Sequence, residues 1–152
     1  MDEIVARSLA RWPNVPAVYG WLELDRRGNW LIKGERIGNP ALREFIARNY
    51  EADQQGRWFF QNGPQRVYVA LDYTPLIVHY EGEALFDHRG RPFSAGEMFQ
   101  DDEGSVLIAG EGSIALLDDR ELARFADRAG VLQSITRAEV PSRFGFVPHP
   151  QP

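Results

Sequence analysis

The sequence predicts an α+β fold built from short antiparallel β-hairpins and small sheets with three helices. Two observations indicate the hairpins: short apolar runs rich in aromatic and β-branched residues, and a turn motif that recurs along the chain. A third observation, apolar residues at helical spacing in three segments, predicts the helices. The 152 residues are 43% hydrophobic and 26% charged, as is typical of a folded protein.

The recurring turn has the form Asp-x-x-Gly and is followed, one residue later, by a bulky residue or proline. It occurs at residues 25–28, 53–56, 87–90 and 101–104. Aspartate can accept hydrogen bonds from its own downstream backbone, and glycine tolerates the positive φ of the bulge that closes such a turn. Asn62-Gly63, between aromatic and β-branched runs, adds a further hairpin signal. These turns predict a chain punctuated by hairpins of one type.

The first helix is expected over residues 2–12, before Pro13 and Pro16 end it. Its apolar residues share one face, and they are Ile4, Val5, Leu9 and Trp12. An amphipathic helix of this kind packs on its own domain more often than on a partner or a membrane. A homodimer formed through this helix is therefore one of our hypotheses.

The other two helices are indicated by capping residues and apolar stripes. Asn39 caps the second helix, and Pro40 occupies its first turn. Asp118 or Asp119 caps the third helix, and Gly130 ends it. The stripes consist of Leu42, Phe45 and Ile46 in the second helix, and of Leu122, Phe125 and Ala126 in the third.

Two blocks of sequence recur in the same order. Residues 25–35 (DRRGNWLIKGE) and 101–111 (DDEGSVLIAGE) share Asp, Gly, Leu, Ile, Gly and Glu in register. A Leu-x-x-Phe-x-x-Arg stripe then follows at 42–48 and again at 122–128. A hairpin followed by a helix, found twice, predicts two related units that arose by internal duplication.

The expected organisation is one compact domain or two tightly packed subdomains. It comprises an N-terminal helix and linker (1–16), a first hairpin–helix–strand unit (17–82), a second related unit (83–140) and a Pro-rich tail (141–152). We expect the last eight or so residues of the tail to be disordered or lightly docked.

The stretches DRRGNWLIKGERIGNPALREFIARNY, GRWFF and RVYVALDYTPLIV resemble the bacterial "domain of unknown function 1285" family over about residues 17–128. The resemblance is at the level of pattern, so it indicates this family or a sister family. It implies an α+β fold with repeated motifs and a conjectured role in signal transduction, and it carries no catalytic residues. The matching positions are Asp25, Gly28, Trp30, Gly34, Ile37, Leu42, Phe45, Asp72 and Pro75.

Composition narrows the classes of function. A net charge of −5 disfavours general nucleic-acid binding, which needs a basic surface. The absence of cysteine excludes disulfides, zinc–thiolate sites and cysteine nucleophiles. No apolar run approaches the roughly 20 residues that span a bilayer, and the acidic N-terminus carries no signal-peptide core. We therefore expect a cytoplasmic protein without a membrane span.

No motif for catalysis stands out, so we assign no catalytic residue, cofactor or metal and leave enzymatic activity undecided. Gly110-x-Gly112-x-x-Ala115 fits a loose dinucleotide fingerprint. The expected helix begins only at Asp118 or Asp119, whose charge would repel a pyrophosphate, so a structural turn is the better interpretation. The three histidines, His79, His88 and His149, lack the spacing of metal ligands.

Aromatic residues on short strands are the remaining candidates for a binding surface. In the strand around residues 58–60, Trp58 and Phe60 share one face and Phe59 takes the other, because successive side chains alternate. One face is expected to be core, and an uncovered second face would bind a partner. The candidate surface consists of Trp58, Phe60, Tyr73, Arg36, Arg66 and Asp72.

The leading hypothesis is a non-catalytic binding or interaction module, in line with a signalling role. The alternative is a small-ligand-binding protein or enzyme with a site between the two repeat units, lined by residues such as Arg36, Arg66 and Asp72. The partner is thus an unidentified protein or small molecule. Neither composition nor patterning distinguishes the two, because function resides in a site rather than in a fold.

Overall fold

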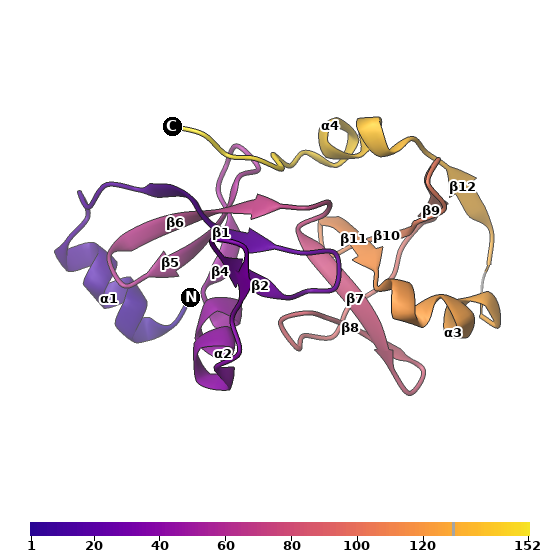
Figure 1. Ribbon diagram of the computed structural model, residues 1–152, viewed down its shortest axis with the longest axis horizontal. Helices are drawn as coiled ribbons and strands as arrows, with labels where there is room; N and C mark the ends of the chain where they lie inside the picture. Colours follow the sequence, from indigo (N-terminus) through magenta and orange to yellow (C-terminus); the bar gives the residue numbers. More distant parts are fainter. Residues whose placement is uncertain (129) are drawn as a thin grey trace. The chain divides into compact units, whose positions relative to one another are not determined.

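The computed structural model describes residues 1–128 and 130–152, which form two compact units (Figure 1). Unit 1 comprises Met1–Asp25, Asn29–Asp72 and Phe146–Pro152, and unit 2 comprises Arg26–Gly28 and Tyr73–Gly145. Each unit is built on a six-stranded sheet that mixes parallel and antiparallel pairs. The predicted α+β class is confirmed.

Unit 1 has its sheet in the order β3-β2-β1-β6-β5-β4. Only β1 and β6 pair in parallel, and the other neighbours are antiparallel. The helix between β3 and β4 carries the predicted apolar stripe. The elements are α1 (Glu3–Arg11), β1 (Val18–Leu24), β2 (Trp30–Ile32), β3 (Glu35–Arg36), α2 (Pro40–Arg48), β4 (Tyr50–Ala52), β5 (Trp58–Asn62) and β6 (Gln65–Leu71).

Unit 2 has its sheet in the order β12-β9-β10-β11-β7-β8, with parallel pairs between β7 and β11 and between β9 and β12. Two short 3₁₀ turns, Asp119–Glu121 and Arg137–Glu139, lead into the helices. The elements are β7 (Leu76–Glu81), β8 (Ala84–Asp87), β9 (Met98–Gln100), β10 (Val106–Gly110), β11 (Ser113–Leu117), α3 (Leu122–Ala126), β12 (Leu132–Ser134) and α4 (Val140–Phe144).

The two sheets share one topology, which supports the predicted duplication. In each unit a hairpin (β1-β2 or β7-β8) is followed by a three-stranded meander (β4-β5-β6 or β9-β10-β11). The last meander strand then pairs in parallel with the first hairpin strand. By strand order the hairpin at 101–111 corresponds to residues 53–63, whereas the sequence match had paired it with 25–35. The two matched blocks resemble each other because both have an Asp-x-x-Gly turn, a strand and a tight turn.

All four Asp-x-x-Gly turns adopt the same predicted conformation. In each one the aspartate N–H donates to the carbonyl four residues later, over 2.8–3.0 Å. The aspartate Oδ1 accepts the backbone N–H of that same later residue. Each closing glycine, at 28, 56, 90 and 104, has a φ between 77° and 84°. This closed ring of bonds explains why so short a motif specifies the turn.

The helix predictions hold for α2 and need correction elsewhere. Asn39 Oδ1 accepts from the N–H groups of Ala41 and Leu42, and Pro40 begins α2, as predicted. The third helix ends at Ala126, short of Gly130. In α1 only Val5 of the predicted apolar face is buried, while Ile4 and Trp12 are exposed. The spacing of apolar residues predicts that a helix has an apolar face, but it does not show what packs against that face.

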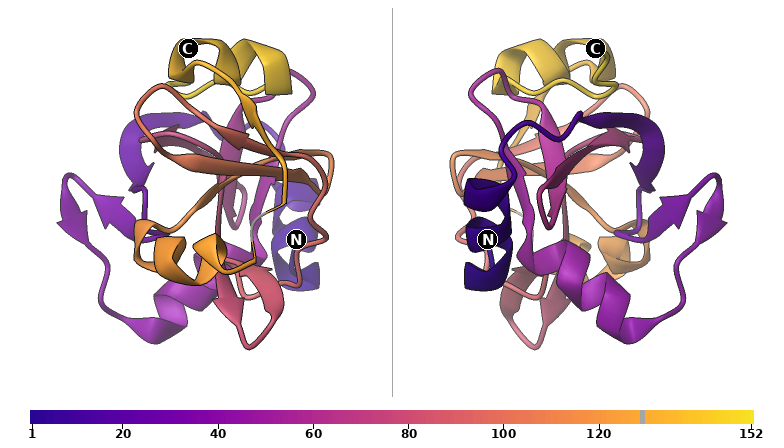
Figure 2. Two further views of the ribbon diagram at one scale, coloured as in Figure 1. Left: turned by 90° about the vertical axis from the view of Figure 1, so that its right-hand side faces the viewer. Right: turned by 90° about the vertical axis from the view of Figure 1, so that its left-hand side faces the viewer.

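The end of the chain is more ordered than the tail prediction describes. Residues 140–144 form a fourth helix, α4, drawn in yellow in Figure 2, and Figure 1 shows an extended stretch between this helix and the C-terminus. Phe146 is buried, and Val147 N–H donates to the Gly56 carbonyl. Pro148 offers its carbonyl to Leu71 N–H. Proline lacks an N–H but keeps a carbonyl, so a Pro-rich segment can still bind a neighbouring strand end.

Candidate functional site

An apolar groove of about 380 Å³ lies between α2 and the sheet of unit 1. Its size falls in the range of ligand sites. Its lining is apolar apart from two neutral amides at one end. The lining residues are Val18, Trp21, Leu22, Ile32, Leu42, Phe45, Ile46, Phe60, Asn62, Gln65 and Val67.

Strand register places the sheet side of this groove. Leu22 pairs with Ile32, and Phe60 pairs with Val67, so these four side chains project on one face. The α2 stripe faces them, and the Phe45 ring meets the Phe60 ring edge-on with centroids 5.6 Å apart. The spacing that makes α2 amphipathic therefore also provides the helical wall of the groove.

The rim of the groove carries three exposed apolar side chains. Trp21 is 53% exposed, and Ile32 and Leu42 are each 39% exposed. Trp21 and Leu22 both line the groove, although neighbours in a regular strand point to opposite faces. The register of β1 on β6 shifts between Val18 and Leu22, and Gly20 within that stretch has a φ of 76°. This irregularity turns Trp21 to the rim, where the Lys33 ammonium lies 4.7 Å from its ring centroid.

The opposite face of the same sheet carries a polar hollow of about 450 Å³. Asp53 accepts from Arg57 Nε at 2.8 Å and from the Tyr68 hydroxyl at 3.0 Å. Burial acts to raise the pKa of Asp53, but the hydrogen bonds from Arg57, Tyr68 and Gln55 outweigh it and lower the pKa. Arg66 lies over the Phe59 ring with its Cζ 3.8 Å from the centroid. The hollow thus contains the hydrogen-bonded pair of Asp53 and Arg57 and, beside it, the guanidinium of Arg66 over the Phe59 ring.

Unit 2 holds a buried tyrosine between two arginines. Tyr73 donates to Asp101 Oδ2 at 2.7 Å, while Arg26 and Arg137 lie over its ring at 5.0 and 4.9 Å. Burial, reinforced by the hydrogen bond to Asp101, raises the pKa of Tyr73 far above its ordinary value. Tyr73 therefore stays a neutral donor that anchors the turn at Asp101, which is a structural role.

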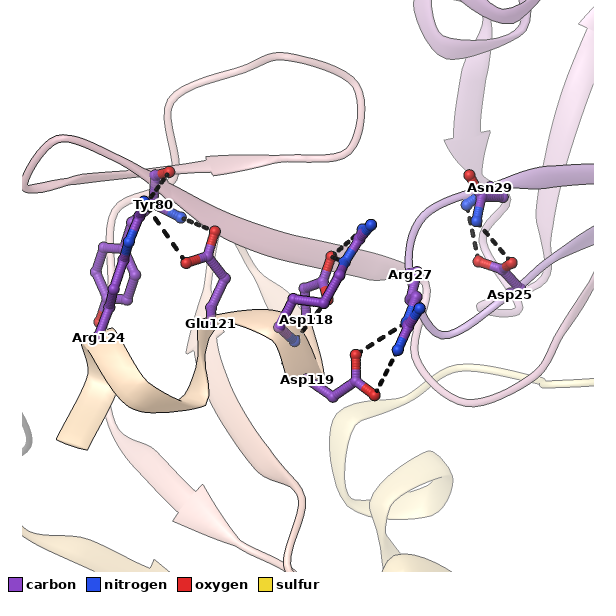
Figure 3. A network of polar contacts seen from close by, with 9 residues as sticks. Asp25, Arg27, Asn29, Tyr80, Asp118, Asp119, Glu121 and Arg124 are labelled. Atoms are coloured by element: carbon purple, nitrogen blue, oxygen red, sulfur yellow. Dashed lines mark hydrogen bonds and ion pairs between the residues drawn. The ribbon is translucent and has the colours of Figure 1, made fainter. Parts of the chain in front are cut away.

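A second polar cluster of unit 2 surrounds the 3₁₀ turn after β11 (Figure 3). Arg27 binds Asp119 through two bonds of 3.0 and 3.1 Å, and Arg120 binds Asp118. The bond to Arg27 lowers the pKa of Asp119, and the same bond raises the pKa of Arg27. The charges of the two ion pairs balance one another beside a pocket of about 300 Å³.

The structure places the six sequence-predicted residues in several environments. Phe60 lines the groove, and Trp58, on the same face of β5, packs 4.8 Å from the Tyr50 ring. Arg66 lies in the polar hollow of the opposite face, and Arg36 is exposed on the edge strand β3. Tyr73 is buried in unit 2.

Asp72, the sixth predicted residue, follows β6 in unit 1. Its N–H donates to the Leu24 carbonyl. Burial raises the pKa of Glu23, and the nearby charges of Asp72 and Asp25 raise it further. Asp72 is thus part of an acidic cluster in unit 1 and does not line the groove.

Sequence reasoning did not select Trp21, Ile32 or Leu42 as site residues. The available signals were the Trp21-Leu22 doublet after Gly20 and a helix stripe that begins with leucine in the first turn. The Gly110–Gly112 segment forms the β10–β11 hairpin turn, with Glu111 and Gly112 at φ of 53° and 71°. That geometry agrees with the structural interpretation of the fingerprint.

Within residues 1–128 and 130–152, no group of three or more His, Cys, Asp or Glu side chains is arranged to hold a metal ion. In the same part of the chain, no helix has the length and apolar character needed to cross a membrane.

Fold and groove together define an α+β protein with a duplicated mixed sheet and a ligand-sized apolar site. A family model, DUF2944, described as "Protein of unknown function (DUF2946)", matches residues 1–133. The chain therefore belongs to this family of unknown function. No curated protein matches the sequence.

Two solved structures share the fold. A DUF1285 family protein from Silicibacter pomeroyi is 19% identical, with a TM-score of 0.58 over 86% of each chain. A DUF1285 family protein from Shewanella baltica is 17% identical, with a TM-score of 0.53 over 72% of this chain and 92% of that chain. The predicted resemblance to DUF1285 is confirmed at the level of the fold, while the family model that matches the sequence is DUF2944.

Proposed function

We propose that this protein is a non-catalytic binding module, and that the groove of unit 1 receives apolar side chains of a protein partner. The observation that carries the proposal is the groove itself, with the exposed rim of Trp21, Ile32 and Leu42. Burying one large apolar side chain contributes roughly 1.5–3 kcal/mol, and tryptophan is enriched among the residues that dominate interfaces.

The residues that line the groove support a role in binding rather than in catalysis. Acid–base and nucleophilic catalysis require a titratable or nucleophilic group in contact with the substrate. All the lining residues are described, and none of them is Asp, Glu, His, Lys, Arg, Cys, Ser, Thr or Tyr. Asn62 and Gln65 offer neutral amides, which can orient an occupant by hydrogen bonding.

The rim favours a protein partner over a small molecule. A small ligand sunk in the groove would leave the outer surfaces of Trp21, Ile32 and Leu42 in water. A protein surface that inserts one side chain would also cover the rim, since interfaces surround a central anchor with contacts that exclude water. A role in signal transduction rests on the resemblance to DUF1285 and stays a prediction, as does a site between the two units.

The test compares Leu42→Glu with Ala41→Glu. Both residues lie in the first turn of α2, where an added carboxylate suits the helix dipole, but only Leu42 lines the groove. We expect Leu42→Glu to abolish capture of the partner from bacterial lysate, while Ala41→Glu captures it as the wild type does. Hydrogen exchange on the captured complex should show protection in β1, β2 and α2.

The neutral fluorophore N-phenyl-1-naphthylamine gives an independent readout of the groove. Its fluorescence should rise with the wild type and with Ala41→Glu, and stay low with Leu42→Glu. Capture that is equal for both variants would refute the assignment of the partner to this groove. A lipid that co-purifies with the wild type and is absent from Leu42→Glu would replace the protein partner with a small ligand.

A further inference from the structure

The polar hollow of unit 1 is independent of the groove, because it lies on the other face of the sheet. Glu51, Phe59 and Tyr68 are directly opposite one another on β4, β5 and β6, so their side chains share a face. Arg66 lies on this face as well, two residues before Tyr68. Trp58 and Phe60 point to the groove side. The hollow measures about 450 Å³, which suits a small molecule.

Two of the four charged residues around the hollow, Asp53 and Arg57, bind each other and the turn between them. Asp53 accepts from the N–H groups of Gln55 and Arg57 and binds the Arg57 side chain. Arg57 also donates to the Tyr68 hydroxyl and lies 4.6 Å from that ring, on which Tyr19 stacks. This pair closes the Asp-x-x-Gly turn and leaves no charge for a ligand.

The other two charges, Glu51 and Arg66, flank the Phe59 ring. Among residues 1–128 and 130–152, neither forms an ion pair within 4.0 Å, with the other or with any further group. The guanidinium of Arg66 lies over the Phe59 ring, with its Cζ 3.8 Å from the ring centroid. The N–H donors of a guanidinium lie in its own plane, where they can bind a carboxylate through two parallel bonds.

We propose that this hollow binds a small zwitterion of the α-amino acid class. Arg66 receives the carboxylate, Glu51 receives the ammonium, and the amino acid side chain lies over the turn at residues 53–55. Glu51 and Arg66 carry opposite charges, so a ligand with one charge of each sign matches them better than an anion or a cation. An anion alone would face the carboxylate of Glu51, and a cation alone would face the guanidinium of Arg66.

The experiment is a protein-observed ¹H–¹⁵N NMR titration of the full chain with the standard L-amino acids. We expect at least one of them to shift the signals of residues 51–57, 59 and 66. Its N-acetyl derivative lacks the ammonium and its amide lacks the carboxylate, so both should bind about tenfold more weakly or worse, since hydrogen bonds between charged groups are the strong ones.

Two variants assign the roles, and two matched variants serve as controls. Arg66→Gln should remove the preference for the acid over the amide, and Glu51→Gln should remove the preference for the free amine over the N-acetyl form. Arg36→Gln and Glu44→Gln, at exposed positions outside the hollow, should bind as the wild type does. Circular dichroism melting checks that each variant folds.

Three outcomes would overturn the proposal. The first is that no amino acid shifts these signals. The second is that the N-acetyl derivative binds as tightly as the free amino acid, which would indicate a carboxylate site. The third is unchanged affinity in both Arg66→Gln and Glu51→Gln. None of these results bears on the groove, whose test uses Leu42 and a neutral probe.

Discussion

Units 1 and 2 share the order and direction of five strands but differ in what lies beside the sheet, and in unit 1 an apolar groove lies between the sheet and α2. The difference lies in the connection between the hairpin and the meander. In unit 1 that connection contains α2, a nine-residue helix. In unit 2 it spans residues 88–97, all of them described, and contains no helix. One sheet topology can thus be built with or without the helix that forms one wall of the groove, depending on a connection.

The groove position is filled in unit 2 by Phe93. Strand order makes Gly110, at the end of β10, the counterpart of Asn62 at the end of β5. Asn62 lines the groove, whereas a Cβ added to Gly110 would lie 2.7 Å from the Phe93 ring. Phe93 is buried and its N–H donates to the Leu85 carbonyl. In unit 2 the Phe93 ring packs against Gly110, whereas the equivalent residue in unit 1, Asn62, lines the groove.

Phe93→Ala should remove this difference between the two units, and we expect it to have the largest effect on stability. Removing a buried phenylalanine costs about 3–5 kcal/mol of unfolding free energy, and here it would open a cavity beside Gly110. Urea denaturation measures the loss, and N-phenyl-1-naphthylamine should then bind a second site. Phe45→Ala is the matched control, because Phe45 is half-buried against a groove that is already open, so its loss should be smaller. Equal losses in the two variants would contradict the comparison.

Gly110→Ala tests the same contact from the other side, with a smaller cost. The new methyl group would lie 2.3 Å from the Ser94 carbonyl oxygen and 2.7 Å from Phe93, so the backbone must move. Overpacking of this kind costs about 1–3 kcal/mol, measured as a lower midpoint in thermal denaturation. Gly38→Ala, where nothing lies within 4 Å, should change the midpoint little. A Gly110→Ala protein as stable as Gly38→Ala would show that Phe93 is not seated on the glycine.

Asp53→Asn should lower the free energy of unfolding by about 1–3 kcal/mol at neutral pH, because hydrogen bonds to a charged group are lost. This effect should depend on pH. The pKa of Asp53 is lowered in the folded state, so its carboxylate stabilises the fold above the unfolded pKa of about 3.9. That contribution disappears as the pH falls through the lower folded value.

The stability gap between wild type and Asp53→Asn should therefore be full at neutral pH and close in acid. Denaturation curves across this pH range measure it, with Glu44→Gln as an exposed control. A gap that does not change with pH would mean that the ionised form of Asp53 contributes nothing to the turn.

Local structure was largely predictable, because the determining contacts lie within a few residues. The Asp-x-x-Gly turns are closed by bonds between positions four apart, and Asn39 caps α2 through N–H groups two and three residues away. The alternation that separates Trp58 and Phe60 from Phe59 follows from the strand itself. The register of the duplication was not predictable, since every Asp-x-x-Gly hairpin resembles every other in sequence.

The candidate sites were predictable only in part. Phe60 and Arg66 were selected from the sequence, and the structure places them on opposite faces of one sheet. The groove depends on the parallel pairing of β1 with β6, between segments more than forty residues apart, which no local pattern encodes. Trp21 reaches the rim only because β1 is irregular at Gly20.

The α+β class, the hairpin turns, the position of α2 and the absence of cysteine chemistry were predictable from the sequence, because each depends on composition or on near neighbours along the chain. The tertiary structure alone decided which apolar faces are covered. Phe93 and Phe45 are both phenylalanines near connections, yet one closes its sheet against a glycine and the other walls an open groove. Whether a residue is buried depends on what packs against it, and the tertiary structure determines which residues do so.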